Sequence, residues 1–389
     1  MSRPSQAAGM LQDRRVSEDS IDWRVAKLGS FINVKHGYAF GGDGITSDET
    51  PSILVTPGNF HVGGGFKSAK LKYFSGAYPQ AYKLKKDDII VTMTDLSKDG
   101  DTLGYGARVP ACEHKAYLHN QRIGLVVFQG EDVDRNFLYW VLRTPEYQGF
   151  VLGAATGTSV RHTSPSTIQQ YEFQLPSRVH EQEAIAATLD SLDRKIDLLH
   201  RQNKTLETMA ETLFRQWFVE DDGEKWEERP LSGVANFLNG LACQKYPPAN
   251  DLEKLPVLKI RELSSGITES SDWATSQVKP EYLVEAGDVI FAWSASLMVK
   301  LWDGEKCVLN QHLFKVTSDE FPKWFYLMWC KHHLAEFIAI SSSQATTMGH
   351  IKRGDLDAAM VLVPPPPVLD TMSKQIGLFA DFRGISIRR

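Results

Sequence analysis

The sequence of 389 residues contains an internal repeat, and this duplication constrains its architecture more than any other feature. The segment Trp23–Ala39 returns as Trp226–Ala242, so that matching Trp, Leu, Asn, Gly and Ala residues lie at one offset of 203. The pair Asn120-Gln121 returns later as Asn310-Gln311. Copies of about 170 residues are too long for solenoid repeats. The duplication therefore predicts two homologous domains that bind two similar things.

The bulk composition is that of an ordinary globular protein, with 42% hydrophobic and 23% charged residues. No apolar run reaches the roughly 18 residues that span a membrane. Residues 1–20 are polar and lack the apolar core of a signal peptide, so we expect a disordered leader and a cytoplasmic protein. The four cysteines, Cys112, Cys243, Cys307 and Cys330, lie too far apart for zinc-finger spacing. We expect buried, reduced thiols and no bound metal.

The net charge of −5 is unevenly distributed. Residues 179–222 contain ten acidic and five basic residues, which accounts for the whole excess. The two repeats are therefore close to neutral. A neutral domain still binds DNA if its basic residues gather on one face, because the phosphate contact is local.

Between the repeats lies the strongest structural signal, a stretch from His180 to Phe218 without Gly or Pro. Its apolar residues are spaced four and three apart, which is the seam of a coiled coil. We expect one conserved helix over residues 179–222, with Asn203 as a polar residue that sets the register. The seam residues are Ile185, Leu189, Leu192, Ile196, Leu199, Leu206, Ala210, Leu213 and Trp217.

A second, shorter helix is predicted over residues 367–389, after a run of four prolines. Met372, Ile376 and Phe379 keep the same spacing, so this helix should pair with the first in an antiparallel coiled coil. Because it is about half as long, we expect the seam from about Asn203 to Trp217 to stay exposed until a partner protein or a second copy covers it.

Each repeat is mainly β in pattern, with short β-rich runs between Gly, Asp and Pro turns. The runs are Pro51–Val55, Asp88–Met93 and Ile123–Phe128, and helical stretches interrupt them near Asn136–Thr144 and Pro322–Ala339. We therefore predict an α+β fold with two homologous, β-rich domains over residues 21–178 and 223–366.

With these features, the chain resembles the specificity subunits of type I restriction-modification systems. The central helix, residues 175–219, has the Pro-then-Glu-Gln entry and the Phe-x-x-Trp-Phe exit of the family's conserved region. The repeated domain opening, the Gly-Asp-Val-Ile element at Gly287–Ile290 with its counterpart Asp87–Ile90, and the two Asn-Gln pairs add to the resemblance. It covers about residues 23 to 380.

The resemblance implies two target recognition domains, each reading one half of a split, asymmetric DNA site. It implies that two modification subunits dock on the helices and methylate adenine, and that restriction subunits add the nuclease and the translocase. S-adenosylmethionine, ATP and Mg would then be bound by those partners, with no cofactor on this chain. Modification subunits or a second copy of the chain would cover the unpaired seam. No GxxxxGK[ST] loop and no DPPY-like or NPPY-like motif is present, which agrees with a non-catalytic subunit.

Candidate DNA contacts are polar residues near the repeated elements, because Arg, Lys, Gln and Asn suit base edges while Lys, Ser and Thr suit phosphates. The strongest are Arg161-His162 and His350-Ile-Lys352-Arg353, which occupy matching positions in the two domains. For each candidate, an ordinary solvated surface role is the alternative. The full set in the first domain is Lys35, His36, Tyr38, Lys67, Lys70, Lys98, Arg108, Ser159, Arg161 and His162, and in the second Gln244, Lys245, Tyr246, Arg261, Lys300, Thr347, His350, Lys352 and Arg353.

Some motifs favour structural roles. The two Asn-Gln pairs are shared by domains of different specificity, so they fit a turn that binds backbone better than a base contact. Gly63–Gly65 is typical of a turn, and His332-His333 of a packed helix. Two alternatives to DNA reading stay open: a structural coiled-coil adaptor or degenerate specificity subunit that binds the modification subunit alone, and an enzyme with an unrecognised site.

Overall fold

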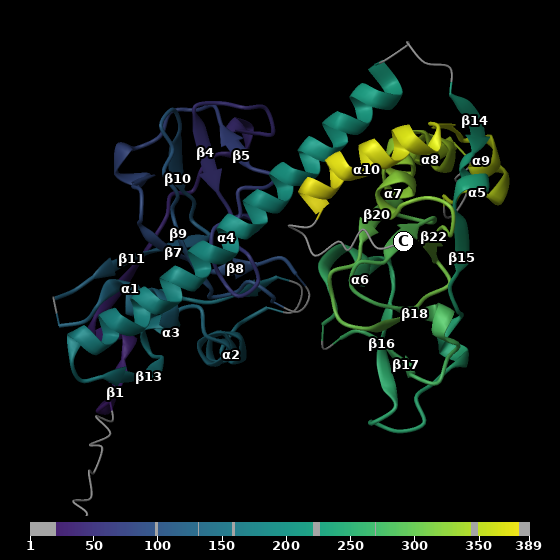
Figure 1. Ribbon diagram of the computed structural model, residues 1–389. Helices are drawn as coiled ribbons and strands as arrows, with labels where there is room; N and C mark the ends of the chain where they lie inside the picture. The colour runs from purple at the N-terminus through teal and green to yellow at the C-terminus, as the bar shows by residue number, and fades with distance from the viewer. Residues whose placement is uncertain are drawn as a thin grey trace, which may run out of the picture. The chain divides into compact units, whose positions relative to one another are not determined.

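The structure is a computed structural model that describes residues 21–97, 100–130, 132–157, 160–220, 226–268, 270–343 and 349–380. The chain divides into two compact units between Ile196 and Asp197. Each unit contains one of the two homologous domains, and helix α4 (Val179–Arg215) contributes to both (Figure 1). The predicted leader, residues 1–20, and the end of the chain, residues 381–389, lie outside the described residues.

The first domain is built on two sheets and a two-stranded ribbon. A four-stranded antiparallel sheet has the order β2-β11-β7-β9, and a five-stranded sheet has the order β3-β5-β4-β10-β6, in which β4 and β10 are parallel. The ribbon pairs β1 with β13 and brings the two ends of the domain together. Its strands are β1 (Trp23–Lys27), β2 (Ile32–His36), β3 (Ile45–Thr46), β4 (Ser52–Val55), β5 (Lys72–Phe74), β6 (Lys83–Leu84), β7 (Ile89–Thr92), β8 (Thr94–Asp95), β9 (Gly106–Arg108), β10 (Ala116–His119), β11 (Ile123–Phe128), β12 (Arg161–His162) and β13 (Glu172–Pro176), and its helices are α1 (Arg135–Val141), α2 (Pro145–Gly153) and α3 (Pro165–Gln169).

The second domain repeats this plan. Its sheets have the orders β15-β22-β19-β20 and β17-β16-β21-β18, and β14 pairs with β23 as β1 pairs with β13. The strands are β14 (Glu227–Pro230), β15 (Asn236–Asn239), β16 (Lys254–Leu258), β17 (Trp273–Thr275), β18 (Leu283–Val284), β19 (Val289–Ala292), β20 (Met298–Leu301), β21 (Cys307–Leu309), β22 (Leu313–Thr317) and β23 (Met360–Val363), and the helices are α5 (Leu231–Val234), α6 (Ile260–Ser265), α7 (Lys323–His332), α8 (Leu334–Ser343), α9 (Arg353–Ala358) and α10 (Pro366–Ala380). The predicted α+β class and duplication are confirmed.

The predicted central helix is present as α4, which continues through Gln216–Glu220 as a π-helix. At 1.5 Å per residue its 37 residues span about 55 Å. The predicted helix at Pro322–Ala339 is instead two helices, α7 and α8, which meet at His333. Three of the predicted buried thiols are buried, but Cys112 is exposed.

The prediction for the helix seam was wrong about which part is exposed. In the second unit, Ala210 and Phe214 of α4 are buried in one hydrophobic core with Met372 and Ile376 of α10, and Trp217 packs against that core. Helix α10 runs alongside this half of α4 in the opposite direction (Figure 1). Aromatic side chains of α7 also pack on this half of α4, since the Trp329 ring lies 5.0 Å from Phe214 and the Trp324 ring 6.2 Å from Trp217, so this half of the seam is covered.

The exposed part of the seam lies nearer the middle of α4. Leu192 and Ile196 are more than half exposed, at 57% and 53%, and Leu199 is 43% exposed. These residues follow one another at the coiled-coil spacing, so an apolar stripe runs along the middle of the helix. Exposed apolar stripes of this kind are typical of surfaces that bind a partner.

Candidate nucleic-acid interface

A shared turn holds the candidate site in both domains. In the first, the backbone of Tyr38 bridges that of Asn120, with Tyr38 N donating to His119 O at 2.8 Å and Gln121 N donating to Tyr38 O at 2.9 Å. The Asn120 side chain accepts a hydrogen bond from Arg122 N at 2.9 Å. A Cβ on Gly37 would lie 2.2 Å from Asn120 O, so only glycine fits there.

The second domain repeats the turn in the same form. Leu241 bridges Asn310, whose side chain accepts from His312 N at 3.4 Å, and a Cβ on Gly240 would lie 2.3 Å from Asn310 O. The repeated glycine and asparagine are thus explained by backbone packing. This supports the structural interpretation of the Asn-Gln pairs.

At the sheet end beside this turn, the first domain gathers polar side chains from four segments. His36 is the last residue of β2, Arg122 directly precedes β11, and Thr94 follows β7. Because β11 is antiparallel to both β2 and β7, these three residues lie at the same end of the sheet. Strand β12 joins them, since His162 pairs with Thr94 and its Nδ1 lies 3.1 Å from the threonine hydroxyl. His36, Arg122 and His162 are exposed and Thr94 is buried. We call these four residues the first polar cluster.

Asp95 fixes the loop beside the first polar cluster. Its buried carboxylate accepts hydrogen bonds from Ser97 N at 2.6 Å and from the backbone and hydroxyl of Thr102 at 2.6 and 2.7 Å. Burial alone would raise the pKa of Asp95, but these hydrogen bonds outweigh it and hold the pKa below its usual value. The carboxylate is therefore a structural anchor for a loop next to the site.

The second domain places different side chains on the same frame. Trp293 Nε1 donates to Asn239 Oδ1 at 3.1 Å, and the Ser294 hydroxyl lies 3.1 Å from His312 Nδ1. His350 bridges Ser294, as His162 pairs with Thr94, and its ring centroid lies 6.2 Å from that of Trp293. We call Asn239, Trp293, Ser294, His312 and His350 the second polar cluster.

The two clusters occupy equivalent positions but differ in chemistry. The end of the opening strand carries His36 in one domain and Asn239 in the other, and the residue after Asn-Gln is Arg122 in one and His312 in the other. Of the residues that form the clusters, sequence reasoning found only His36, His162 and His350. Arg122 and His312 were missed, although each directly follows a repeated Asn-Gln pair, which is a usable signal.

Most of the other predicted contacts are exposed, as a DNA contact must be, but they lie outside the clusters. Tyr38 is 37% exposed and Arg161 is half-buried, with its backbone paired to Asp95. The remaining exposed candidates are Lys35, Lys67, Lys70, Gln244, Lys245, Tyr246 and Lys352. Lys98, Ser159 and Thr347 lie outside the described residues.

Arg108 has a structural role that removes it from the candidate contacts. Its guanidinium donates to Asp190 of α4 at 3.0 Å and to Asn136 at 3.1 Å, and it lies 3.9 Å from the centroid of the Tyr139 ring. It therefore ties the four-stranded sheet to α1 and α4. A guanidinium held by an acid, an amide and a ring is not free to read a base.

Two candidate DNA contacts in the second domain, Arg261 and Lys300, are likewise bound to other groups of the protein. Arg261 donates to the buried carboxylate of Glu262 at 2.7 Å, which neutralises a charge that would be costly alone. Lys300 donates to the carbonyls of Leu263 and Ser264 at 3.0 and 3.2 Å, so it caps the end of α6. Both were predicted from charge alone, which does not distinguish a structural cation from a free one.

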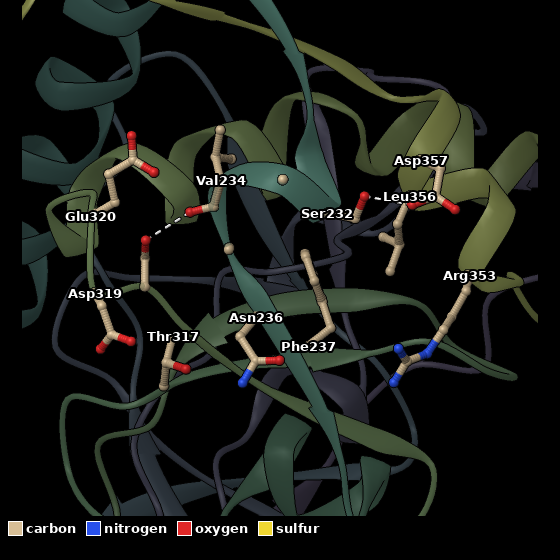
Figure 2. A pocket seen from close by; sticks show the side chains of 13 residues that line it. Ser232, Val234, Asn236, Phe237, Thr317, Asp319, Glu320, Arg353, Leu356 and Asp357 are labelled. Carbon is tan, nitrogen blue, oxygen red and sulfur yellow. Dashed lines mark hydrogen bonds between the residues drawn. The ribbon is translucent and has the colours of Figure 1, made fainter.

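Arg353 lies away from the second polar cluster. It lines a pocket of about 460 Å³ at the opposite end of β15 and β22, with Asp319, Glu320 and Asp357 in the same lining (Figure 2). Asp357 is bound by the Ser232 hydroxyl, as Figure 2 also shows. Three carboxylates make this pocket an unfavourable place for a phosphate.

His332 and His333 are packing residues, as predicted. The His332 ring lies 5.3 Å from Trp329, and His333 stacks on the same indole while one of its ring nitrogens lies 2.9 Å from Met360 O. Across the described ranges, no three His, Cys, Asp or Glu side chains gather as metal ligands would. Within the same ranges, no helix has the length and apolar character needed to cross a membrane.

Comparison with known proteins agrees with this architecture. The family model described as "Type I restriction modification DNA specificity domain" matches residues 20–208 and again residues 223–376. The MjaIX specificity subunit of Methanocaldococcus jannaschii is 23% identical over 264 residues, which cover 61% of this chain and 61% of that protein. The EcoBI specificity subunit of Escherichia coli is 26% identical over 144 residues, which cover 36% of this chain and 30% of that protein. The matched part is thus less than two thirds of either relative.

The fold is also found in a solved structure. The crystal structure of the type I restriction-modification S subunit from M. genitalium matches with a TM-score of 0.52 and 13% sequence identity, covering 95% of both chains. At that identity the likeness shows the fold alone. The two matches to one family model cover most of the chain, and each coincides with one of the two domains. The chain therefore contains two specificity domains and belongs to the family of type I restriction-modification specificity proteins.

Proposed function

We propose that this chain is the DNA-recognition subunit of a type I restriction-modification complex and reads a bipartite, asymmetric site. The observation that carries the proposal is the pair of polar clusters, which share one backbone frame and differ in side chains. Donors and acceptors placed on a rigid frame suit base edges in the major groove. Two frames with different side chains suit two different half-sites.

The first polar cluster offers an exposed Arg122 beside His36 and His162. Arginine pairs bidentately with guanine, so guanine is the base class that this cluster suits best. The second cluster offers the amide of Asn239 and the rings of His312 and His350, with Trp293 as an apolar wall. Asparagine pairs bidentately with adenine.

The chain would perform no chemistry itself. In this proposal two modification subunits methylate adenine with S-adenosylmethionine, and restriction subunits contribute ATP- and Mg-dependent cleavage. The exposed stripe Leu192, Ile196 and Leu199 is the surface on α4 where a modification subunit would dock. Because these three side chains are already about half buried, a partner that covers them would gain roughly 0.7–1.5 kcal/mol for each.

Selection of bound sites from random DNA by the full chain tests the proposal. Arg122→Ala should relax the base preference of one half-site by about 1–3 kcal/mol, and His312→Ala should relax the other half-site alone. Lys85→Ala, at an exposed lysine outside both clusters, is the control and should leave both preferences unchanged. If the full chain selects no DNA sequence while a modification subunit still copurifies, the adaptor function is correct instead. If the chain selects DNA but neither variant changes a base preference, the two polar clusters are not the surfaces that read the bases.

A further inference from the structure

A basic groove lies on the first domain, at the edge of its five-stranded sheet. The groove has a volume of about 710 Å³ and is lined by the edge strand β6, by the start of β10 and by residues 110–115 before β10. Its lining contains four lysines and one acid, so it has a formal net charge of +3 with histidine neutral, although the whole chain has −5. These charged residues are Lys83, Lys85, Lys86, Glu113 and Lys115.

Two of the lysines, Lys83 and Lys85, have no acid to neutralise them. Both are exposed, and neither has an ion-pair partner among the residues that the structure describes. Because side chains alternate along a strand, both point to one side, whereas the buried Leu84 between them points to the other. Two like charges on one side repel each other, so an anion that contacts both is favoured there.

The other two lysines add to the positive potential more weakly. Lys115 is paired with Glu49, and Lys86 lies 3.7 Å from the exposed carboxylate of Asp87. Cations that line a concave surface together attract anions more strongly than the same cations on a flat one. The groove is therefore suited to a phosphate.

The matching edge of the second domain has the opposite charge. Strand pairing fixes the correspondence, because Tyr117 pairs with Leu84 as Cys307 pairs with Val284. Three acids and no base stand at the positions of the five charged lining residues. In the order given above, the counterparts are Leu283, Glu285, Ala286, Asp303 and Glu305.

Protection of a sheet edge is the alternative role for these lysines, because charged residues on an edge strand block its pairing with other chains. Strand β18, Leu283–Val284, is likewise the edge of its sheet and contains no lysine. Lys115 lies outside the edge strand, yet it lines the same groove. Edge protection alone therefore does not explain why four lysines gather here.

Two tyrosines connect the groove to the first polar cluster. Tyr82 directly precedes β6, and its ring lies 5.2 Å from that of Tyr38. Tyr38 belongs to the shared turn, where Gln121 N donates to its carbonyl, and Arg122 of the cluster follows Gln121. Lys83 and Arg122 are thus linked through two adjacent rings on one domain.

The distance between the groove and the cluster suits a DNA duplex. Lys115 precedes β10 and Arg122 follows the turn after it, so the four residues of the strand, about 13 Å, separate them. The major groove of B-DNA is about 12 Å wide. A domain that places Arg122 on a base edge therefore meets a phosphate strand within about that distance. Lys83 lies within it too, because β6 pairs with β10.

We propose that this groove binds the DNA phosphate backbone beside the half-site that the first domain reads, with Lys83 and Lys85 as the main phosphate contacts. The inference rests on the proposed function, since it concerns the same DNA. The acidic edge of the second domain would repel a phosphate, so the two domains differ in how they hold the backbone as well as in the bases they read. Phosphate contacts of this kind fix the position of the protein on the duplex without reading sequence.

DNA binding by the full chain, measured at several salt concentrations, tests the proposal. Each lost phosphate contact lowers the slope of log K against log salt by about 0.9. Lys83→Ala with Lys85→Ala should therefore lower the slope by about 1.8 and weaken binding roughly 10- to 60-fold at 0.1 M salt. The loss should be equal for all sequences, and the base preferences of both half-sites should stay as in the wild type.

Two control variants separate the groove from total charge and from folding. Lys83→Arg with Lys85→Arg keeps both charges and should keep the wild-type slope. Lys27→Ala with Lys195→Ala removes two exposed lysines elsewhere in the first unit and should leave the slope unchanged. Thermal unfolding should be alike in all of these variants, because the four side chains are exposed.

A wild-type slope in the groove variant, or an equal loss in the Lys27 and Lys195 variant, would overturn the proposal. So would a groove variant that aggregates while its soluble fraction binds DNA normally, since the lysines would then protect a sheet edge. Normal DNA binding with loss of a copurifying modification subunit would also overturn it, because the groove would then hold an acidic protein surface.

Failure of the proposed function gives a different result. If the chain binds DNA but selects no sequence, the proposed function is wrong, and the salt slope of the variants still decides whether the groove holds phosphate. If the wild-type chain binds no DNA at all, both proposals are refuted.

Discussion

Replacing Gly37 by alanine in the first domain, or Gly240 in the second, breaks the turn that holds the corresponding polar cluster. The new Cβ would lie 2.2 Å from Asn120 O in the first domain and 2.3 Å from Asn310 O in the second. A carbon–oxygen contact is ordinarily about 3.3 Å or longer. The two backbone segments must therefore separate by about 1 Å, because no flexible side chain is available to move.

The cost follows from the contacts at the turn. The separation removes the bonds from Tyr38 N to His119 O and from Gln121 N to Tyr38 O, at about 0.5–1.5 kcal/mol each. Overpacking adds about 1–3 kcal/mol. We therefore expect a loss of about 2–6 kcal/mol, confined to the altered domain.

Hydrogen exchange measured by domain, together with selection of bound DNA, checks this expectation. Gly37→Ala should lose protection at Tyr38 and Gln121 and lose selectivity at one half-site, with the other half-site unchanged. Gly41→Ala is the matched control, since a Cβ there meets nothing within 4 Å. Protection as in the wild type for Gly37→Ala, or equal damage from Gly41→Ala, would refute the reasoning.

Three further predictions concern α4 and the loop at Asp95. Asp190→Ala should destabilise the first domain by about 1–3 kcal/mol in urea unfolding, because it removes the hydrogen bonds that Arg108 and Trp140 donate at 3.0 and 2.8 Å. Asp197→Ala is the control and should cost less than about 1 kcal/mol, because the ion pair that it removes, with Arg201, is exposed. The pKa of Asp95 is lowered in the folded state. Its contribution to the free energy of unfolding is therefore fully present above the unfolded-state pKa near 3.8, and it is lost as the pH falls through the folded-state pKa. Unfolding of Asp95→Asn should approach that of the wild type only in this acidic range, and a constant difference at all pH values would contradict the assignment. Inserting seven residues after Ile196 should lengthen α4 by about 10 Å and change the spacer between selected half-sites, whereas an unchanged spacer would exclude a role of α4 in spacing.

Much of the fold could be predicted because its signals are local. The long helix follows from a Gly- and Pro-free run with a regular apolar spacing, and the start of α10 follows from a run of prolines. The two repeated turns left matching Gly and Asn residues, because a Cβ would collide with backbone there. Residues required by local backbone geometry are the ones that two diverged copies still share.

The polar clusters could be predicted only in part. Thr94 meets His162 across 68 residues and Trp293 meets Asn239 across 54, so the contacts depend on strand register and on how distant segments return to one sheet end. His162 and His350 were found because both copies retain them. Arg122 and His312 were missed because the two copies differ at this position, and a residue type that changes between the copies leaves no repeated signal.

The sequence by itself determined that the molecule has two homologous domains, a long helix between them and a family to which both belong. Only the tertiary structure decided which charged residues are structural, since Arg108, Arg261 and Lys300 reveal their partners only when distant segments meet. It also decided which part of the α4 seam is covered. The physical reason is the same in each case: a periodic or repeated pattern is written along the chain, whereas burial and pairing depend on neighbours that the chain brings from far away.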